Sequence, residues 1–241
     1  SMLLYSILYL TGYPDISLED IKNFRQLNSK TAGHPEYGHL PGIETTTGPL
    51  GQGLGNAVGF AVAEEFVAAR WGSHLCDHFT YVIAGDGCLM EGISQEVISL
   101  AGRLKLKKLI VIWDDNGITI DGPLDLSCNT DQISRFQSSG WSTFSCDAHN
   151  PIEIDQAISN AKKDPRPSLI AAKSIIGYGS KGKQGTSGVH GAALGKSEVN
   201  QLRNNFNWNY NEFVIPSNIK SAWEKIGQKN YQLFKERRKW V

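Results

Sequence analysis

The sequence predicts an α/β fold in which a parallel sheet lies between helices on both faces, as a three-layer domain. Short apolar runs at residues 80–84, 109–113 and 168–173 contain β-branched side chains and are typical of buried strands. Helical patterns separate these runs, as at residues 91–104. Strands that alternate with helices imply a parallel sheet covered on both sides.

The first eighty residues predict helices around one long loop. Residues 1–12 have apolar residues at helical spacing and are too short to cross a bilayer, so we expect a core helix there. Ser17 and Asp20 have the spacing of a capping box, which predicts a helix to about Asn28. Glycine, proline and threonine dominate residues 30–53, and loops of this length in compact domains are usually functional. A helix rich in small residues is predicted over 54–71.

The rest of the chain continues the alternation. A short helix is predicted over 131–138 and a strand over 141–146. Asn150 followed by Pro151 is typical of a capped helix start. Residues 177–195 form a second glycine-rich loop, and the tail from Ile219 predicts a helix with one apolar face. We expect a cofactor-binding domain over 1–215 and an amphipathic helical linker over 216–241.

Composition limits the classes of partner. The chain has 241 residues, 40% of them hydrophobic, which is enough for the core of one α/β domain. Lysine plus arginine and aspartate plus glutamate are balanced at 24 each, so overall charge favours neither a nucleic-acid nor a membrane partner. The four cysteines show no Cys-x-x-Cys pattern, and we expect free thiols and a cytoplasmic location.

The most informative motif is Gly85-Asp86-Gly87, followed by Asn116 and Ile118 after the next predicted strand. Parallel strands end at the same edge of a sheet, so a carboxylate and a carboxamide should converge there. Few oxygen ligands facing an open cleft suit Mg²⁺ held together with a diphosphate, with Ca²⁺ or Mn²⁺ as substitutes. A Gly-Asp-Gly alone is often only a tight turn, but the matched asparagine favours the metal site. The backbone N–H groups near the helix start would face the diphosphate.

This spacing resembles the thiamine diphosphate signature, and a longer series of motifs resembles one family in particular, transketolase. The series runs in order from residue 1 to about 215 and consists of Gly-His-Pro-Glu at 33–36, Thr-Thr-Gly-Pro-Leu-Gly-Gln-Gly at 46–53, Asp-Gly-Cys-Leu-Met-Glu-Gly at 86–92, Ile-Thr-Ile-Asp-Gly at 118–122 and Val-His-Gly-Ala at 189–192. Related thiamine enzymes share the Gly-Asp-Gly and the asparagine but not this whole series.

The resemblance implies roles for individual residues. Asp86, the side chain of Asn116 and the backbone carbonyl of Ile118 would hold Mg²⁺. Gly87 would donate its N–H to the diphosphate. The resemblance further implies that three loop residues line the rings of thiamine diphosphate: Gly48, Pro49 and Leu50.

Two histidines match the family's substrate-binding motifs. A histidine in a loop is usually a surface residue or a satisfied hydrogen-bonding group, as we expect for His149. His34 corresponds to a residue that binds hydroxyl groups of the sugar donor. His190 corresponds to one beside the diphosphate and the reacting oxygen. An imidazole suits proton exchange near neutral pH, so we expect both to be catalytic.

The resemblance also implies what the chain does and what it lacks. We expect the diphosphate-binding part of a homodimeric enzyme that transfers a two-carbon ketol unit from a ketose phosphate to an aldose phosphate, in the pentose phosphate pathway. Family members begin earlier, and a following pyrimidine-binding domain supplies the glutamate that activates the cofactor, so we expect this fragment alone to be inactive. Two alternatives stay open: another thiamine enzyme, of the formaldehyde transketolase or deoxyxylulose-phosphate synthase type, or a non-catalytic cofactor-binding or dimerisation module.

Overall fold

The computed structural model describes residues 1–229 and residue 235, and these form two compact units. The larger unit comprises residues 49–208 and contains every strand of the described chain. The smaller unit joins residues 1–48 to the described residues from 209 onward. This division follows internal contacts, and the predicted boundary after residue 215 stays a prediction.

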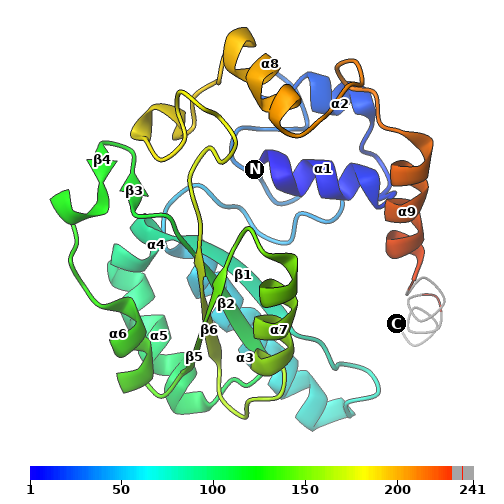
Figure 1. The fold of residues 1–241 in the computed structure, drawn as a ribbon. Coiled ribbons are helices and arrows are strands. Elements are labelled where there is room, and N and C mark those ends of the chain that lie inside the picture. The colour runs from blue at the N-terminus through cyan, green and yellow to red at the C-terminus, as the bar shows by residue number, and fades with distance from the viewer. Residues whose placement is uncertain (230–234, 236–241) are drawn as a thin grey trace. The chain divides into compact units, whose positions relative to one another are not determined.

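The larger unit is built around a parallel sheet, as predicted (Figure 1). Four strands lie in the order β1-β2-β6-β5, and every neighbouring pair is parallel. Their bounds are β1 Thr80–Gly85, β2 Leu109–Asp115, β5 Ser142–Asp147 and β6 Ser168–Lys173. A two-stranded antiparallel ribbon follows β2 and consists of β3 Ile118–Thr119 and β4 Gly122–Pro123.

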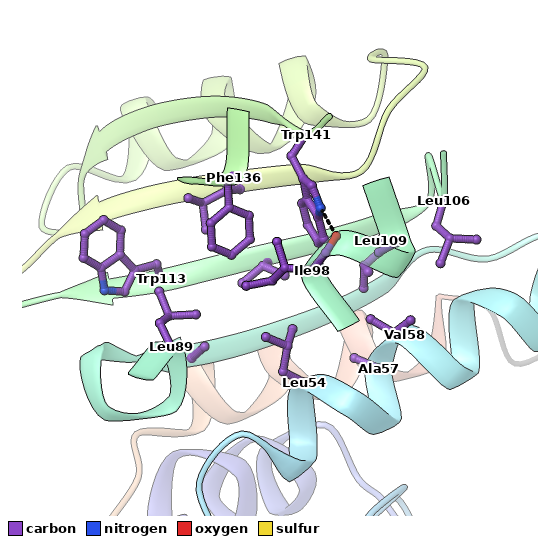
Figure 2. Close-up of a cluster of buried hydrophobic side chains, with 14 of the residues drawn as sticks. Leu54, Ala57, Val58, Leu89, Ile98, Leu106, Leu109, Trp113, Phe136 and Trp141 are labelled. Atoms are coloured by element: carbon purple, nitrogen blue, oxygen red, sulfur yellow. Dashed lines mark hydrogen bonds between the residues drawn. The ribbon is translucent and has the colours of Figure 1, made fainter. Parts of the chain in front are cut away.

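Helices cover both faces of the sheet, which confirms the three-layer prediction. One buried cluster joins α3, α5 and α6 to the strands, and Figure 2 shows its side chains. A second cluster joins α7 to the opposite face through Ile110, Ile170 and Ala172. The helices of this unit are α3 Gln52–Trp71, α4 Asp86–Met90, α5 Gly92–Leu104, α6 Gln132–Ser138, α7 Pro151–Ala161 and α8 Lys196–Asn205, with single 3₁₀ turns at Leu124–Leu126 and Ser187–Val189.

Helix α5 lies close to residues 139–141, which connect α6 to β5. The indole Nε1–H of Trp141 donates to the backbone oxygen of Ile98 at 2.8 Å, and the Trp141 and Phe136 rings meet edge to face (Figure 2). A Cβ at Gly102 would lie 1.7 Å from the backbone oxygen of Ser139. The chain segments therefore approach each other at a distance that only glycine allows.

The smaller unit contains α1 Met2–Leu10, α2 Leu18–Lys22 and α9 Ser217–Gln228. Helix α1 buries Tyr5 and Leu8 in a separate cluster, as expected of a core helix. Helix α9 lies within the predicted linker, whose residues 230–234 and 236–241 fall outside the described chain.

The prediction that α2 continues to Asn28 is wrong. The capping box of Ser17 and Asp20 is present, but the helix ends at Lys22. The Asn23 side chain donates to the backbone oxygen of Glu19 and competes with the helix there. Arg25 and Asn28 both adopt positive φ, which no α-helix can contain.

Candidate functional site

The carboxyl edge of the sheet brings the predicted metal ligands together. Strand β1 ends at Gly85, which pairs with Asp114 near the end of β2. Asp86 therefore begins α4 at the same edge where the turn of residues 116–118 leaves β2. The sequence predicted this edge, but it did not predict α4, because a helix of five residues that contains Gly87 is too short to show a helical period.

Asp86 is a buried carboxylate with one oxygen left over. Asp86 is 6% exposed, and its Oδ1 accepts a hydrogen bond from Trp113 Nε1 at 2.9 Å. Its Oδ2 is buried and has no hydrogen-bond partner among the described residues. Buried polar atoms are nearly always paired, so this oxygen is a candidate for binding an additional ligand.

The electrostatic surroundings of Asp86 disfavour its negative charge. Burial is the largest cause and raises its pKa, and the carboxylates of Asp115 and Asp114 raise it further. The Trp113 hydrogen bond and the backbone N–H of Gly117 act in the opposite direction, but the net pKa is raised. A cation at this edge would offset both the burial and the neighbouring charges.

The Asn116 side chain shapes the turn that faces this edge. Its Oδ1 accepts the backbone N–H of Ile118 at 2.9 Å, and its Nδ2 donates to Asp114 Oδ2 at 3.2 Å. Gly117 has a φ of 68°, a left-handed conformation that favours glycine. The turn therefore presents a carboxamide, a glycine N–H and the Ile118 backbone within three residues.

Gly87 and Leu50 lie against each other within the larger unit. A Cβ at Gly87 would lie 3.1 Å from Leu50 Cδ1, so the leucine side chain covers the start of α4. Leu50 is itself half exposed, and Pro49 before it is exposed. Two of the predicted cofactor-lining positions are thus next to each other in space.

Gly48 and His34 form a second such pair, within the smaller unit. A Cβ at Gly48 would lie 3.0 Å from His34 Cγ, and the φ of 141° at Gly48 also favours glycine. His34 is exposed. Both residues belong to the smaller unit, whereas the carboxyl edge belongs to the larger one. A role for His34 at that edge stays a prediction.

His190 lies in the loop of residues 177–195, which is ordered by hydrogen bonds within the loop and to α8. Glu198 Oε2 on α8 accepts from Ser180 Oγ at 2.6 Å and from the backbone N–H of Gly182 at 3.3 Å, and these bonds lower the Glu198 pKa. Lys183 Nζ donates to the backbone oxygen of Leu194 at 2.9 Å. His190 is exposed, with its backbone N–H bonded to Ser187. Its catalytic role stays a prediction.

Sequence reasoning missed three residues that support these elements. Trp113 binds Asp86, and Asp114 binds Asn116. Tyr178 stacks on His149 at a centroid distance of 3.9 Å, while His149 Nε2 accepts the backbone N–H of Ile175. Only Trp113 carried a signal, since an indole N–H at the end of a buried strand needs an acceptor.

Two kinds of feature are absent from the part of the chain that the structure describes. Within residues 1–229 and 235, no group of three or more histidine, cysteine, aspartate or glutamate side chains could hold a metal ion. Of the three predicted ligands, only Asp86 is a side chain of this kind, because Asn116 would contribute a carboxamide and Ile118 a backbone carbonyl. The helices of the described part include none that is both long enough and apolar enough to cross a membrane.

Known proteins resemble the chain over its whole length. The family described as "Transketolase, thiamine diphosphate binding domain" matches residues 1–241. A transketolase from Rhodobacter capsulatus is 55% identical over 240 residues, which cover 100% of this chain and 35% of the relative. Transketolase 1 from Aliivibrio fischeri is 54% identical over 228 residues, or 93% of this chain and 34% of the relative.

Solved structures of transketolases superpose on this chain over nearly all of its length. A transketolase from Campylobacter jejuni superposes with a TM-score of 0.92 at 44% identity, covering 98% of this chain and 38% of that one. A transketolase from Pichia stipitis in complex with sedoheptulose-7-phosphate gives a TM-score of 0.93 at 44% identity, covering 98% and 36%. The chain spans about a third of the length of the curated relatives it matches. This chain therefore belongs to the transketolase family and corresponds to its thiamine diphosphate binding domain.

Proposed function

We propose that this chain holds Mg²⁺ and the diphosphate end of thiamine diphosphate in an enzyme that transfers a two-carbon ketol unit between phosphorylated sugars. The observation that carries the proposal is the buried Oδ2 of Asp86, which has no partner among the described residues and lies at the edge that also presents Asn116. A hard cation satisfies such an oxygen and neutralises the charge that burial disfavours.

The residues at the edge fit the two groups. Asp86, Asn116 Oδ1 and the Ile118 carbonyl are hard oxygen donors of the kind that Mg²⁺ prefers, and Ca²⁺ or Mn²⁺ would be accepted as substitutes. The N–H of Gly87 would donate to the diphosphate. Gly48, Pro49 and Leu50 would line the rings with backbone and apolar atoms. Bound thiamine diphosphate supplies the nucleophilic carbon that carries the two-carbon unit.

The two histidines would act on the sugar. His34 would bind hydroxyl groups of the ketose phosphate donor and so orient it. His190 would exchange a proton with the reacting oxygen, since an imidazole holds or releases a proton near neutral pH. The complete enzyme would act as a homodimer in the cytoplasm, with the remaining two thirds of its length supplying the pyrimidine-binding domain.

Removal of the Asp86 carboxylate tests the metal site. In the full-length enzyme, Asp86→Ala should abolish most Mg²⁺-dependent binding of thiamine diphosphate, because the diphosphate loses its bridging cation. Calorimetric titration of the cofactor at fixed Mg²⁺ measures the affinity. Asp125→Ala removes an exposed aspartate from the 3₁₀ turn after β4 and should leave the affinity unchanged. Wild-type affinity in Asp86→Ala would rule out this site.

His190→Ala tests the catalytic half of the proposal. We expect kcat to fall about 10²–10⁴-fold, the usual contribution of a positioned proton donor or acceptor. Steady-state assays with a ketose phosphate and an aldose phosphate at saturating cofactor measure it. His74→Ala, at an exposed histidine in the loop before β1, is the matched control. An unchanged kcat in His190→Ala would remove His190 from the mechanism.

A further inference from the structure

Asp114 lies between the carboxyl edge and strand β6, and its carboxylate binds a group on each side. Its Oδ2 accepts from Asn116 Nδ2 at 3.2 Å. Its Oδ1 accepts from the hydroxyl of Ser174, the residue after β6. The carboxylate is therefore held in place by one strand while it contacts the turn that follows another.

We propose that Asp114 is a positioning residue that selects the orientation of the Asn116 carboxamide, so that the amide oxygen faces the cation site. This inference rests on the proposed function. In this proposal Asp114 itself contacts neither the metal nor the cofactor nor the substrate.

The orientation of the Asn116 amide is determined by which neighbouring atoms donate hydrogen bonds and which accept them. An ionised carboxylate only accepts hydrogen bonds, so it selects the NH₂ end of the neighbouring amide. The opposite end must then be the oxygen, and there Asn116 Oδ1 accepts the N–H of Ile118. A flipped amide would place two donors together at Ile118 and two acceptors together at Asp114. Both contacts thus specify the same orientation.

The selected orientation leaves capacity for a metal. An amide oxygen has two lone pairs, and the N–H of Ile118 uses one of them. The second lone pair is available to a cation, whereas an NH₂ group in its place would repel one. The orientation of a single amide therefore decides whether Asn116 is a ligand or an obstacle.

The adjacent Asp115 provides the contrast. Its Oδ1 pairs with Lys173 Nζ at 3.2 Å, and its backbone oxygen accepts from the N–H of Ser174. Its charge lies near Asp86, but among the described residues the Asn116 amide bonds to Asp114 and Ile118 and not to Asp115. Charge alone would make the two aspartates equivalent, whereas positioning makes them different.

A double-mutant cycle in the full-length enzyme tests the proposal. Asp114→Asn should weaken Mg²⁺ binding about 10–100-fold, the usual effect of losing a group that orients a metal ligand. In the Asn116→Ala background the same substitution should change Mg²⁺ affinity less than about 3-fold, because residues that act through one another are not additive. Calorimetry of Mg²⁺ binding in the presence of thiamine diphosphate is the readout.

The controls separate positioning from charge and from folding. Asp115→Asn removes one negative charge near Asp86, as Asp114→Asn does, and should alter Mg²⁺ affinity less than about 3-fold. Ser174→Ala loosens Asp114 without changing charge and should reduce affinity in the same direction as Asp114→Asn, so it replaces that variant in the cycle if Asp114→Asn does not fold. Full additivity of the Asp114 and Asn116 effects would overturn the proposal. Unchanged Mg²⁺ affinity in Asn116→Ala itself would instead overturn the proposed metal site.

Discussion

Asp86 and Glu64 are both buried carboxylates in the larger unit, and they are compensated in different ways. Glu64, on α3, is 1% exposed, and its Oε1 lies 2.6 Å from Lys108 Nζ. Asp86 is 6% exposed and has an indole N–H in place of a lysine. Each keeps one buried oxygen without a hydrogen-bond partner in the described residues.

The difference lies in the neighbouring charges. Lys108 also pairs with Asp77 at 2.8 Å, and these two acids raise its pKa despite burial, so the cation stays charged beside Glu64. Asp86 instead has two further carboxylates near it. Glu64 thus has its counter-ion within the chain, which is typical of a structural ion pair. Asp86 has no such counter-ion among the described residues, and the proposed Mg²⁺ would supply one.

The largest effect should follow from removing the internal counter-ion. Lys108→Met leaves Glu64 buried and unpaired, which costs about 3–5 kcal/mol of unfolding free energy. Denaturant unfolding of the metal-free enzyme measures the loss. The double variant Glu64→Gln with Lys108→Met should recover much of it, because no buried charge remains. A single variant as stable as wild type would show that Glu64 does not need its lysine.

Trp113→Phe should weaken the site at Asp86. The Asp86 carboxylate loses its hydrogen bond from the indole, and hydrogen bonds to charged groups contribute about 1.5–3 kcal/mol. Because that bond stabilises the ionised form, the pKa of Asp86 should rise further. As the pH is lowered, Asp86 should therefore become protonated, and Mg²⁺-dependent cofactor binding should be lost, at a higher pH than in wild type. Binding titrations at a series of pH values measure this. Trp141→Phe removes the other buried indole N–H, to Ile98, and should lower stability without moving that pH dependence. Equal shifts in both variants would contradict the assignment.

The smallest effect concerns the pH dependence of stability without metal. The Asp86 pKa is raised, so the folded state retains its proton at a pH where the unfolded state has lost it. Stability should therefore fall as pH rises from the ordinary aspartate range near about 4 through the raised pKa. The melting temperature of the metal-free enzyme should show this slope, and Asp86→Asn should reduce it. Saturating Mg²⁺ and cofactor should also reduce it in wild type.

The contrast between the two carboxylates could not be predicted from the sequence. The strands, their parallel direction and the convergence of Asp86 with Asn116 followed from apolar runs and from the rule that parallel strands end together, whereas the order of the strands did not. Lys108 lies 44 positions from Glu64, and no local pattern indicates such a pair. The contact between Asp114 and Ser174 spans 60 positions and depends on which strands are neighbours.

Local backbone competition explains the remaining differences. The side chain of Asn23 and the positive φ of Arg25 end α2 early, although the residues up to Asn28 fit a helical pattern. Helix α4 is stabilised by α5, where Ser94 Oγ donates to the backbone oxygen of Cys88 and Gln95 Nε2 to that of Leu89. His149 was predicted to be a surface residue or a satisfied hydrogen-bonding group. It is exposed and accepts the N–H of Ile175, but its stacking on Tyr178 carries no sequence signal.

The strand order also has a consequence for the kinetics of folding. Strands β1 and β2 are separated in the sequence only by α4, α5 and their connections, so a loop of moderate length brings them together. Strand β6 also pairs with β2, but it follows β5 and α7 in the sequence, so this pairing closes a longer loop. Non-local parallel pairings of this kind form slowly, because loop closure costs entropy before the contacts form. The bond between Asp114 and Ser174 lies across that last junction. The proposed cation site should thus be completed late in folding, and stopped-flow Mg²⁺ binding would report the pairing of β6 with β2 rather than the collapse of the core.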